Sequence, residues 1–410
     1  MELVNGQYQV QGVALTDVVK EFGSPVYVYD AEKISSQYHH LKSAFSGLNV
    51  KLKYACKSLT NINVLRLLKN EGAGCDAVSI NEVKMAFLAG FAKEDIMYTP
   101  NCVAFSEIEE AVELGVHINI DNIPFLEKFG AKYGSSVPIC IRINPHITAG
   151  GNKNIQVGHV GSKFGISILQ LDEVIEVVNR VDLNVEGIHV HTGSDILDTE
   201  VWMKGAAIVF KAAKNFADLQ FLDFGSGFKV AYYEGAHVTD IEKLGKSMTE
   251  AFKKFCADYG RELEIWFEPG KFLVSESGYL LVTTNLIKET PACTFIGVDS
   301  GFNHLIRPMM YDAHHDIVNL SNTTDTETHV YNVVGNICET DTFATDRDLP
   351  RTKEGDILAF KNAGAYGYMM ASNFNARFRP AEVMIYKGEA KLIRARDTFE
   401  DLMRGQVEIL

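Results

Sequence analysis

The sequence predicts an α/β fold in two parts: a (β/α)8 TIM-like barrel and a C-terminal β-rich domain of the β-barrel or sandwich type. Three observations support this prediction. The chain has 410 residues, which is more than one typical core accommodates. Eight apolar runs alternate with helix-like stretches between residues 51 and 270. After residue 275 the alternation gives way to strands joined by loops.

The eight expected barrel strands are short runs rich in apolar or β-branched residues. The stretches between them repeat apolar residues at intervals of three and four, and Gly72, Gly90 and Gly115 stand where three helices are expected to end. An open doubly wound sheet would also alternate strands and helices, but the count of eight favours the barrel. The expected strands cover residues 51–57, 74–79, 95–101, 117–122, 138–145, 186–194, 219–227 and 264–270.

The β-rich domain is expected from five strand-like runs with little helix between them. We therefore expect the barrel at residues 26–275, and we expect residues 1–25 and 276–410 to form the β-rich C-terminal domain. The five runs cover residues 279–290, 293–301, 328–336, 356–364 and 381–394.

Composition limits the classes of function. The formal net charge is −14, so the protein is not expected to bind nucleic acid, which is itself a polyanion. The seven cysteines form no CxxC pair and are odd in number, which argues against a disulfide framework or a structural zinc site and favours a reducing cytoplasm. The N-terminal residues do not resemble a signal peptide, and no apolar run approaches the ~18 residues of a membrane span.

Lys57 lies at the end of the first expected barrel strand, in YACKS. The C-terminal ends of the strands form the active-site face of such barrels. A lysine amine among apolar neighbours is suited to forming a Schiff base with an aldehyde cofactor. The alternative is a solvated surface lysine without a chemical role.

Two histidines alternate in HVHTGS, at the end of the sixth expected strand. His189 and His191 should point to the same face, because side chains alternate along a strand. A metal pair is one interpretation, but no nearby carboxylate convincingly completes a ligand triad, so we expect no metal. One histidine could instead be packed in the core while the other lies flat against an aromatic cofactor ring, with Ser194 donating to a phosphate.

Two segments follow the seventh and eighth expected strands, where barrels often bind phosphate. The first is GSG, residues 225–227, whose backbone amides are able to approach an anion closely. The second is EPGK, residues 268–271, whose glutamate could pair with a protonated pyridine nitrogen. Each segment alone is weak evidence, because glycines and turns at strand ends are common, but together they are more specific.

The expected second domain holds further candidates. Cys338 and Glu339 adjoin in CETDTF, where a thiol suited to proton donation stands beside a cation-binding carboxylate. Most free cysteines are merely small buried apolar residues, which is the alternative. Arg307 and Tyr311 lie four residues apart in RPMMYDAHH, an arrangement suited to binding a substrate carboxylate.

These segments together resemble one family. YACKS, HVHTGS, GSG, EPG, RPMMYDAHH, CETDTF and GAYGYMMASNFNARFRPAE are similar, in this order, to the motifs of the diaminopimelate decarboxylases. That family belongs, with ornithine decarboxylase and alanine racemase, to the fold type III enzymes that use pyridoxal 5'-phosphate. The resemblance runs from residue 25 to residue 385, which is nearly the whole chain.

The resemblance implies roles for individual residues. Lys57 would hold pyridoxal phosphate covalently, His191 would stack on its ring, and Glu268 would bind the pyridine nitrogen. Cys338 would donate the proton that replaces CO2. Further cofactor contacts would come from Ser194, Gly225, Ser226, Gly227, Pro269, Gly270, Lys271 and Tyr366. Substrate would be bound by Lys271, Arg307, Tyr311, Glu339 and Tyr366.

The implied reaction is decarboxylation of meso-2,6-diaminopimelate to L-lysine and CO2 through an external aldimine, the last step of lysine biosynthesis. The resemblance also implies a homodimer with shared active sites, in which Cys338 and Glu339 enter from the partner subunit. A decarboxylase of ornithine, arginine or carboxynorspermidine is one alternative, but Arg307 beside Glu339 favours a substrate with an amino-acid group at both ends. A non-catalytic regulator on the same fold is a second alternative, but Lys57 and Cys338 are both present. A carrier protein for pyridoxal phosphate is a third, but it would be a single short barrel, whereas this chain has a long second domain.

Two positions depart from the family's usual pattern. Ser226 stands where the family commonly has the middle glycine of GGG, and Lys271 stands where arginine commonly follows EPG. Serine leaves the backbone amides available. Lysine keeps the charge but lacks the planar fork that binds an anion through two parallel hydrogen bonds.

Overall fold

The computed structural model describes residues 1–147 and 158–410. The chain divides into two compact units, which we call the sheet-rich unit and the barrel unit. The sheet-rich unit comprises residues 1–34, 231–236 and 273–410, and the barrel unit comprises residues 35–230 and 237–272.

The barrel unit is a closed parallel barrel, which confirms the predicted fold class. Within the described residues, eight strands pair in the order β9-β11-β12-β13-β5-β6-β7-β8, and the pairing of β8 with β9 closes the ring. A short strand, β10 (Ile166–Ser167), extends β9 on one side. The barrel strands are β5 (Val50–Ala55), β6 (Gly74–Ala77), β7 (Ile96–Tyr98), β8 (His117–Ile120), β9 (Ile139–Asn144), β11 (Val185–Val190), β12 (Phe221–Asp223) and β13 (Glu264–Phe267).

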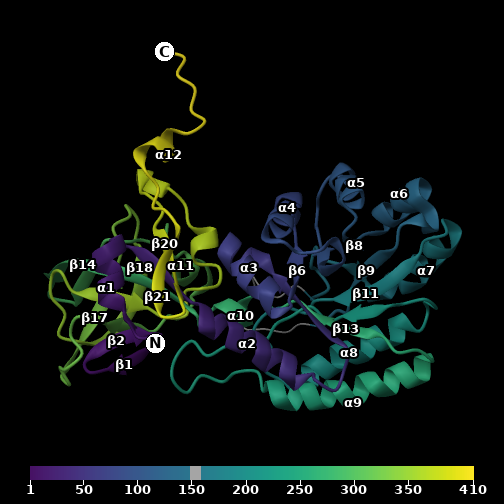
Figure 1. Cartoon of the computed structure of the whole chain (residues 1–410), viewed down its shortest axis with the longest axis horizontal. Coiled ribbons are helices and arrows are strands. Elements are labelled where there is room, and N and C mark those ends of the chain that lie inside the picture. Colours follow the sequence, from purple (N-terminus) through teal and green to yellow (C-terminus); the bar gives the residue numbers. More distant parts are fainter. Residues whose placement is uncertain (148–157) are drawn as a thin grey trace. The chain divides into compact units, whose positions relative to one another are not determined.

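Helices follow the barrel strands in sequence and lie around the outside of the barrel (Figure 1). Gly72, Gly90 and Gly115 each end a helix in the left-handed conformation, as the sequence predicts. Asn61, Ser79 and Asn122 accept hydrogen bonds from backbone N–H groups at helix starts. The helices are α3 (Ile62–Glu71), α4 (Ile80–Ala89), α5 (Phe105–Leu114), α6 (Ile123–Tyr133), α7 (Leu171–Arg180), α8 (Thr199–Ala213) and α9 (Ile241–Tyr259).

The sheet-rich unit is built on β14 (Gly278–Glu289), whose first half pairs with β4 (Val26–Asp30) and β19 (Ile357–Phe360). Its second half pairs with β15 (Thr294–Val298). The other strands are β1 (Glu2–Val4), β2 (Gln7–Val10), β3 (Val13–Ala14), β16 (Ile317–Asn319), β17 (Thr328–Val334), β18 (Thr342–Pro350), β20 (Ala381–Tyr386) and β21 (Glu389–Arg394).

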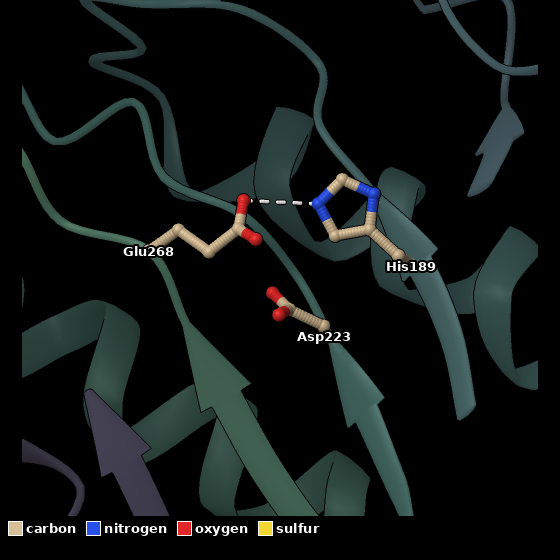
Figure 2. Close-up of side chains that lie close together, drawn as sticks. All are labelled: His189, Asp223 and Glu268. Carbon is tan, nitrogen blue, oxygen red and sulfur yellow. Dashed lines mark hydrogen bonds and ion pairs between the residues drawn. The ribbon is translucent and has the colours of Figure 1, made fainter. Parts of the chain in front are cut away.

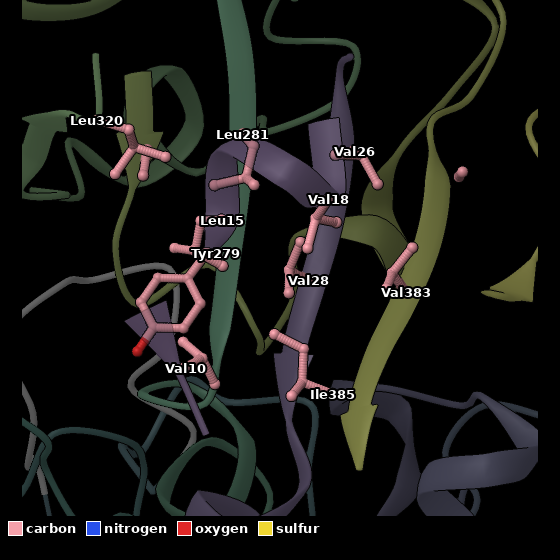
Figure 3. Packing of buried hydrophobic residues seen from close by; sticks show 12 residues of the cluster. Val10, Leu15, Val18, Val26, Val28, Tyr279, Leu281, Leu320, Val383 and Ile385 are labelled. Carbon is pink, nitrogen blue, oxygen red and sulfur yellow. The ribbon is translucent and has the colours of Figure 1, made fainter. Parts of the chain in front are cut away.

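One apolar cluster joins the two ends of the sequence within this unit. Leu15 and Val18 of α1 (Leu15–Phe22) pack against residues of β4, β14 and β20, such as Val28, Leu281 and Val383 (Figure 3). These side chains are at most a few per cent exposed, so their burial contributes strongly to the stability of the unit. The remaining helices of the chain are α2 (Ala31–Ala44), α10 (Lys271–Val274), α11 (Arg307–Tyr311) and α12 (Phe399–Met403).

A search of the described residues for a helix of membrane-spanning length and apolarity finds none.

Candidate active site

Strand β5 ends at Ala55, two residues before Lys57. The lysine itself lies in the 3₁₀ turn that follows (Cys56–Ser58). Its Nζ donates a hydrogen bond to Oδ2 of Asp76 at 3.0 Å. Asp76 comes from β6, the neighbouring strand of the barrel, and its side chain is fully buried, whereas 40% of the Lys57 side chain is exposed. The amine is therefore accessible and is held by a buried carboxylate.

Burial raises the pKa of Asp76 from its usual 3.8 to about 6; the charge of Glu268 adds to this, and Lys57 opposes it. A folded-state pKa above the unfolded value means that ionisation of Asp76 costs stability as pH rises through this interval. Asp76→Asn removes this cost. We expect the melting temperature of Asp76→Asn, relative to the unsubstituted protein, to increase between about pH 4.5 and about pH 7.5, by the equivalent of roughly 1–3 kcal/mol.

The control for this experiment is Asp348→Asn, since Asp348 is exposed on β18. Thermal unfolding of the three cofactor-free proteins across this pH range measures the difference. A melting-temperature difference between Asp76→Asn and the unsubstituted protein that does not change with pH would contradict the assignment.

Glu268 follows β13 and forms a hydrogen bond through Oε2 with Nε2 of His189, at 2.9 Å (Figure 2). Burial raises the pKa of Glu268, but the charge of His189 and its hydrogen bond, together with Lys57, lower it to about 2. Burial lowers the pKa of His189. We interpret the pair as an ionised Glu268 that accepts a hydrogen bond from the Nε2–H of His189. Oε1 of Glu268 is buried and has no hydrogen-bond partner among the described residues.

Asp223, at the end of β12, lies beside this pair (Figure 2). The sequence indicated no carboxylate that convincingly completes a ligand triad with the two histidines. The structure places two carboxylates there, because one ligand atom from each of His189, Asp223 and Glu268 lies within 4.8 Å of the others. The sequence missed the group because its members come from β11, β12 and the end of β13, which only the barrel brings together. That no metal binds here stays a prediction, supported by the direct hydrogen bond between His189 and Glu268.

His191 accepts a hydrogen bond at Nδ1 from the backbone N–H of Ser226, at 3.2 Å. Burial lowers the pKa of His191 to about 3, and the charges of Arg142 and Lys57 add to this effect. A neutral imidazole agrees with the hydrogen bond, since only an unprotonated Nδ1 accepts an N–H. This hydrogen bond holds the His191 ring against the backbone of residues 225–227.

The GSG segment approaches its neighbours more closely than a side chain would permit. Gly225 has φ +61, and a Cβ added there would lie 2.6 Å from Nδ1 of His191. Gly227 has φ +133, and its Cβ would lie 2.6 Å from the carbonyl oxygen of Gly193. Ser226 between them contributes its backbone N–H, so the departure from GGG leaves the close approach intact.

Backbone hydrogen bonds tie the strand-end segments into one group. The N–H of Glu268 donates to Gly225 at 2.7 Å, and the N–H of Ala55 donates to Pro269 at 3.2 Å. A Cβ at Gly270 would lie 3.1 Å from Oγ of Ser58, next to Lys57. The structure therefore brings the segment of residues 268–270 against both the glycine segment and the lysine turn.

Asp195 directly follows Ser194 in the sequence and forms an ion pair with Lys271. Lys271 begins α10 and donates to both carboxylate oxygens of Asp195, at 2.8 and 2.9 Å. Ser194 is half-buried in the same turn, and the next residue after Asp195, Ile196, donates its N–H to Gly227 at 2.8 Å. Lys271 thus contacts an anion of the protein itself, which the sequence did not predict.

The remaining predicted residues belong to the sheet-rich unit. Arg307 is buried in α11, where Nη2 donates to the Tyr232 hydroxyl at 3.0 Å and Nε donates to His315 at 3.4 Å. Tyr311, at the other end of α11, is half-buried, as is Tyr366, which has φ +57. Cys338 and Glu339, by contrast, are exposed in the loop between β17 and β18.

Comparison with known proteins decides the family. Residues 31–275 match the family model described as "Pyridoxal-dependent decarboxylase, pyridoxal binding domain". A diaminopimelate decarboxylase of Methanothermobacter thermautotrophicus is 38% identical over 98% of this chain and 96% of its own length. The chain belongs to the pyridoxal-dependent decarboxylase family, with the diaminopimelate decarboxylases. The family resemblance predicted from the motifs is thus confirmed.

Solved structures agree with this membership. A diaminopimelate decarboxylase from Methanocaldococcus jannaschii superimposes with a TM-score of 0.91 at 29% identity. The match covers 100% of this chain and 98% of that protein's chain. A diaminopimelate decarboxylase from Helicobacter pylori, complexed with L-lysine, gives a TM-score of 0.87 at 32% identity, covering 95% of this chain and 98% of its own.

The barrel residues fit pyridoxal phosphate. Lys57 offers an accessible amine for the aldehyde, and the buried Oε1 of Glu268 offers an acceptor for a protonated pyridine nitrogen. His191 is a neutral ring held in place by the backbone N–H of Ser226, and the missing side chains at Gly225 and Gly227 let this segment lie close to the ring. The N–H of Gly225 donates to Oδ1 of Asp223.

Three polar residues of this site were not singled out from the sequence: Asp76, Asp223 and Asp195. Asp76 was detectable, because GCDAVS is the second expected strand and its end must lie beside Lys57 in a barrel. Asp195 directly follows Ser194, and Asp223 lies two residues before Gly225, but their partners depend on backbone turns that no spacing rule predicts.

Proposed function

We propose that this protein decarboxylates meso-2,6-diaminopimelate to L-lysine and CO2 with pyridoxal phosphate as cofactor. The observation that supports this most strongly is similarity over nearly the whole chain to proteins named diaminopimelate decarboxylase, including a 38% identical relative. The same relatives support lysine biosynthesis as the pathway. The odd number of cysteines and the missing CxxC pairs support a cytoplasmic location.

Within the barrel unit we propose these roles. Lys57 binds the cofactor aldehyde covalently, and Glu268, kept ionised by His189, holds the proton on the pyridine nitrogen. His191 lies against the ring. The remaining contacts to the cofactor come from Ser194, Gly225, Ser226, Gly227, Pro269, Gly270, Lys271 and, from the sheet-rich unit, Tyr366. Pyridoxal phosphate supplies an electron sink for the pair of electrons left when CO2 departs.

In the sheet-rich unit we propose that Cys338 donates the proton that replaces CO2. The substrate is bound by Arg307, Tyr311, Glu339 and Tyr366, with Lys271 of the barrel unit. The distal amino-acid group carries a carboxylate and an ammonium, so it needs both a cation, Arg307, and an anion, Glu339. Cys338 and Glu339 are exposed on their own chain, which supports a homodimer in which they complete the site of the partner subunit.

An assay of CO2 release tests the function. Purified protein with pyridoxal phosphate is offered meso-diaminopimelate, ornithine, arginine and L-lysine in parallel. We expect meso-diaminopimelate to give the highest kcat/KM. Faster release from ornithine or arginine would replace the proposal with the decarboxylase of that amino acid, and release from none would favour a non-catalytic member of the family.

Arg307→Ala should lower kcat/KM for meso-diaminopimelate, because a charged partner of the distal carboxylate is lost. The decrease should correspond to a loss of about 2–4 kcal/mol of transition-state stabilisation. Arg307 also holds Tyr232, so thermal unfolding of the variant must be measured alongside. Arg307→Lys keeps a cation and is the matched control. A loss of equal size with ornithine, which has no distal carboxylate, would show that Arg307 acts only through the fold.

Lys271→Ala should weaken pyridoxal phosphate binding by about tenfold, because Asp195 and the turn that holds Ser194 lose their ion pair. Lys271→Arg should be tolerated, since the charge is retained. Fluorescence titration with the cofactor gives the three dissociation constants, with Lys214→Ala as a control from an exposed ion pair. Equal affinity in all forms would mean that the pair does not support the cofactor site.

A further inference from the structure

The side chain of Asn375 meets Cys338 at two points within the sheet-rich unit. The backbone N–H of Cys338 donates to Oδ1 of Asn375 at 3.2 Å. Nδ2 of Asn375 donates to Sγ of Cys338 at 3.3 Å. One amide therefore contacts both the backbone and the sulfur of the same cysteine.

The chemistry of these contacts fixes the orientation of the amide. A backbone N–H is a donor only, so it must face Oδ1 of Asn375 and not the amide nitrogen. Nδ2 is then directed at the sulfur as a donor. With Sγ accepting from Nδ2, the contact uses a lone pair of the sulfur and leaves the S–H proton of Cys338 available to another acceptor.

The backbone around Cys338 is fixed independently of Asn375. Buried Asp341 accepts hydrogen bonds from the N–H groups of Phe302 at 2.6 Å and Ile337 at 2.9 Å, and its own carbonyl accepts from Gly335 at 2.8 Å. The loop is thereby held at both ends. What the loop itself does not determine is the direction of the Cys338 side chain.

We propose that Asn375 is a positioning residue for Cys338: it fixes the direction of the sulfur and stabilises the thiolate that forms when the proton leaves. This inference rests on the proposed role of Cys338 as proton donor. In that step the S–H bond breaks, a C–H bond forms at the carbon that has lost CO2, and the negative charge stays on sulfur, where the Nδ2–H of Asn375 faces it. Water then returns a proton to the thiolate.

Asn375→Asp separates the two contacts, because it keeps an oxygen for the Cys338 N–H and replaces the donor to sulfur by a negatively charged oxygen. Asn373→Ala is the matched control. Asn373 lies in the same segment, but its Nδ2 donates to the backbone carbonyl oxygen of Arg377 at 2.9 Å and to Oδ2 of Asp397 at 2.8 Å. A general loosening of the segment would affect both variants.

The first measurement is alkylation by iodoacetamide at fixed pH, with each cysteine quantified by peptide mass spectrometry. Alkylation requires the thiolate. We expect Cys338 to react about tenfold more slowly in Asn375→Asp than in the unsubstituted protein or in Asn373→Ala. Exposed Cys102 is the internal reference and should react equally in all three. An unchanged rate at Cys338, or an equal decrease in Asn373→Ala, would overturn the proposal.

The second measurement uses turnover of meso-diaminopimelate in deuterated water. Asn375→Asp and Asn375→Ala should lower kcat by about tenfold with little change in KM, and should place deuterium on both faces of the product carbon that lost CO2. Deuterium confined to one face in both variants would contradict a positioning role. If the unsubstituted enzyme does not turn over meso-diaminopimelate, the proposed function fails, while the alkylation result still decides the contact.

Discussion

Lys57→Ala is expected to lower kcat for meso-diaminopimelate by at least about 10³-fold, because covalent catalysis by the amine is lost. The structure gives this lysine what the role requires: an accessible Nζ, a buried carboxylate at 3.0 Å, and Glu268 close enough to influence that carboxylate. Borohydride reduction of the unsubstituted holoenzyme should then place the pyridoxyl group on the peptide that contains Lys57.

Lys51→Ala is the matched control for this experiment. Lys51 lies on the same strand, β5, its side chain is also 40% exposed, and it also pairs with a carboxylate, that of Glu264 at 3.2 Å. It lies at the opposite end of the strand from the proposed site, so we expect Lys51→Ala to retain activity and labelling. A pyridoxyl label on any lysine other than Lys57, or substantial turnover by Lys57→Ala, would contradict the assignment of Lys57 as the cofactor-binding lysine.

The barrel could be predicted from the sequence because its signals are local. Each strand is a short apolar run, and each helix repeats apolar residues at three and four and often ends at a glycine. The partners of strands outside the barrel are not local. Nothing in VYVYD, the sequence of β4, indicates that it pairs with β14 and β20, which lie more than 200 residues further along the chain.

The candidate site divides in the same way. Lys57, His191 and Glu268 were predicted because strand ends meet at one face of a barrel, and motifs mark them. Partners that hold these residues were harder to predict. His189 on β11 forms a hydrogen bond with Glu268, which follows β13. Asn375 contacts Cys338, from which it is separated by 37 positions in the sequence. Such contacts depend on side-chain directions in turns, which sequence spacing does not determine.

Cys338→Ala is expected to lower formation of L-lysine by about 10²–10⁴-fold, the usual contribution of a positioned proton donor. The residue is exposed on its own chain, together with Glu339 and the neighbouring Phe374 and Phe378. Exposed aromatic side chains beside a thiol with a proposed catalytic role indicate a surface that a partner covers. We therefore expect this surface to close the barrel of a second copy of the chain.

Subunit exchange between two inactive variants tests that expectation. Lys57→Ala and Cys338→Ala should each be nearly inactive as homodimers. In a mixed dimer, one barrel has Lys57 and receives an intact Cys338 from the other chain, while the second site has both defects. Random pairing makes about half of the dimers mixed, and each has one working site, so activity should return to about a quarter of that of the unsubstituted enzyme.

The outcome separates two ways of completing the site. Native mass spectrometry of the mixture must first show that mixed dimers have formed, with Lys51→Ala replacing Lys57→Ala in a parallel mixture as the control for exchange itself. Recovery with Lys57→Ala then requires that lysine and cysteine of one working site come from different chains. If mixed dimers are present and no activity returns, each chain uses its own Cys338. In that case one site of the mixed dimer lacks Lys57 and the other lacks Cys338, so neither site works.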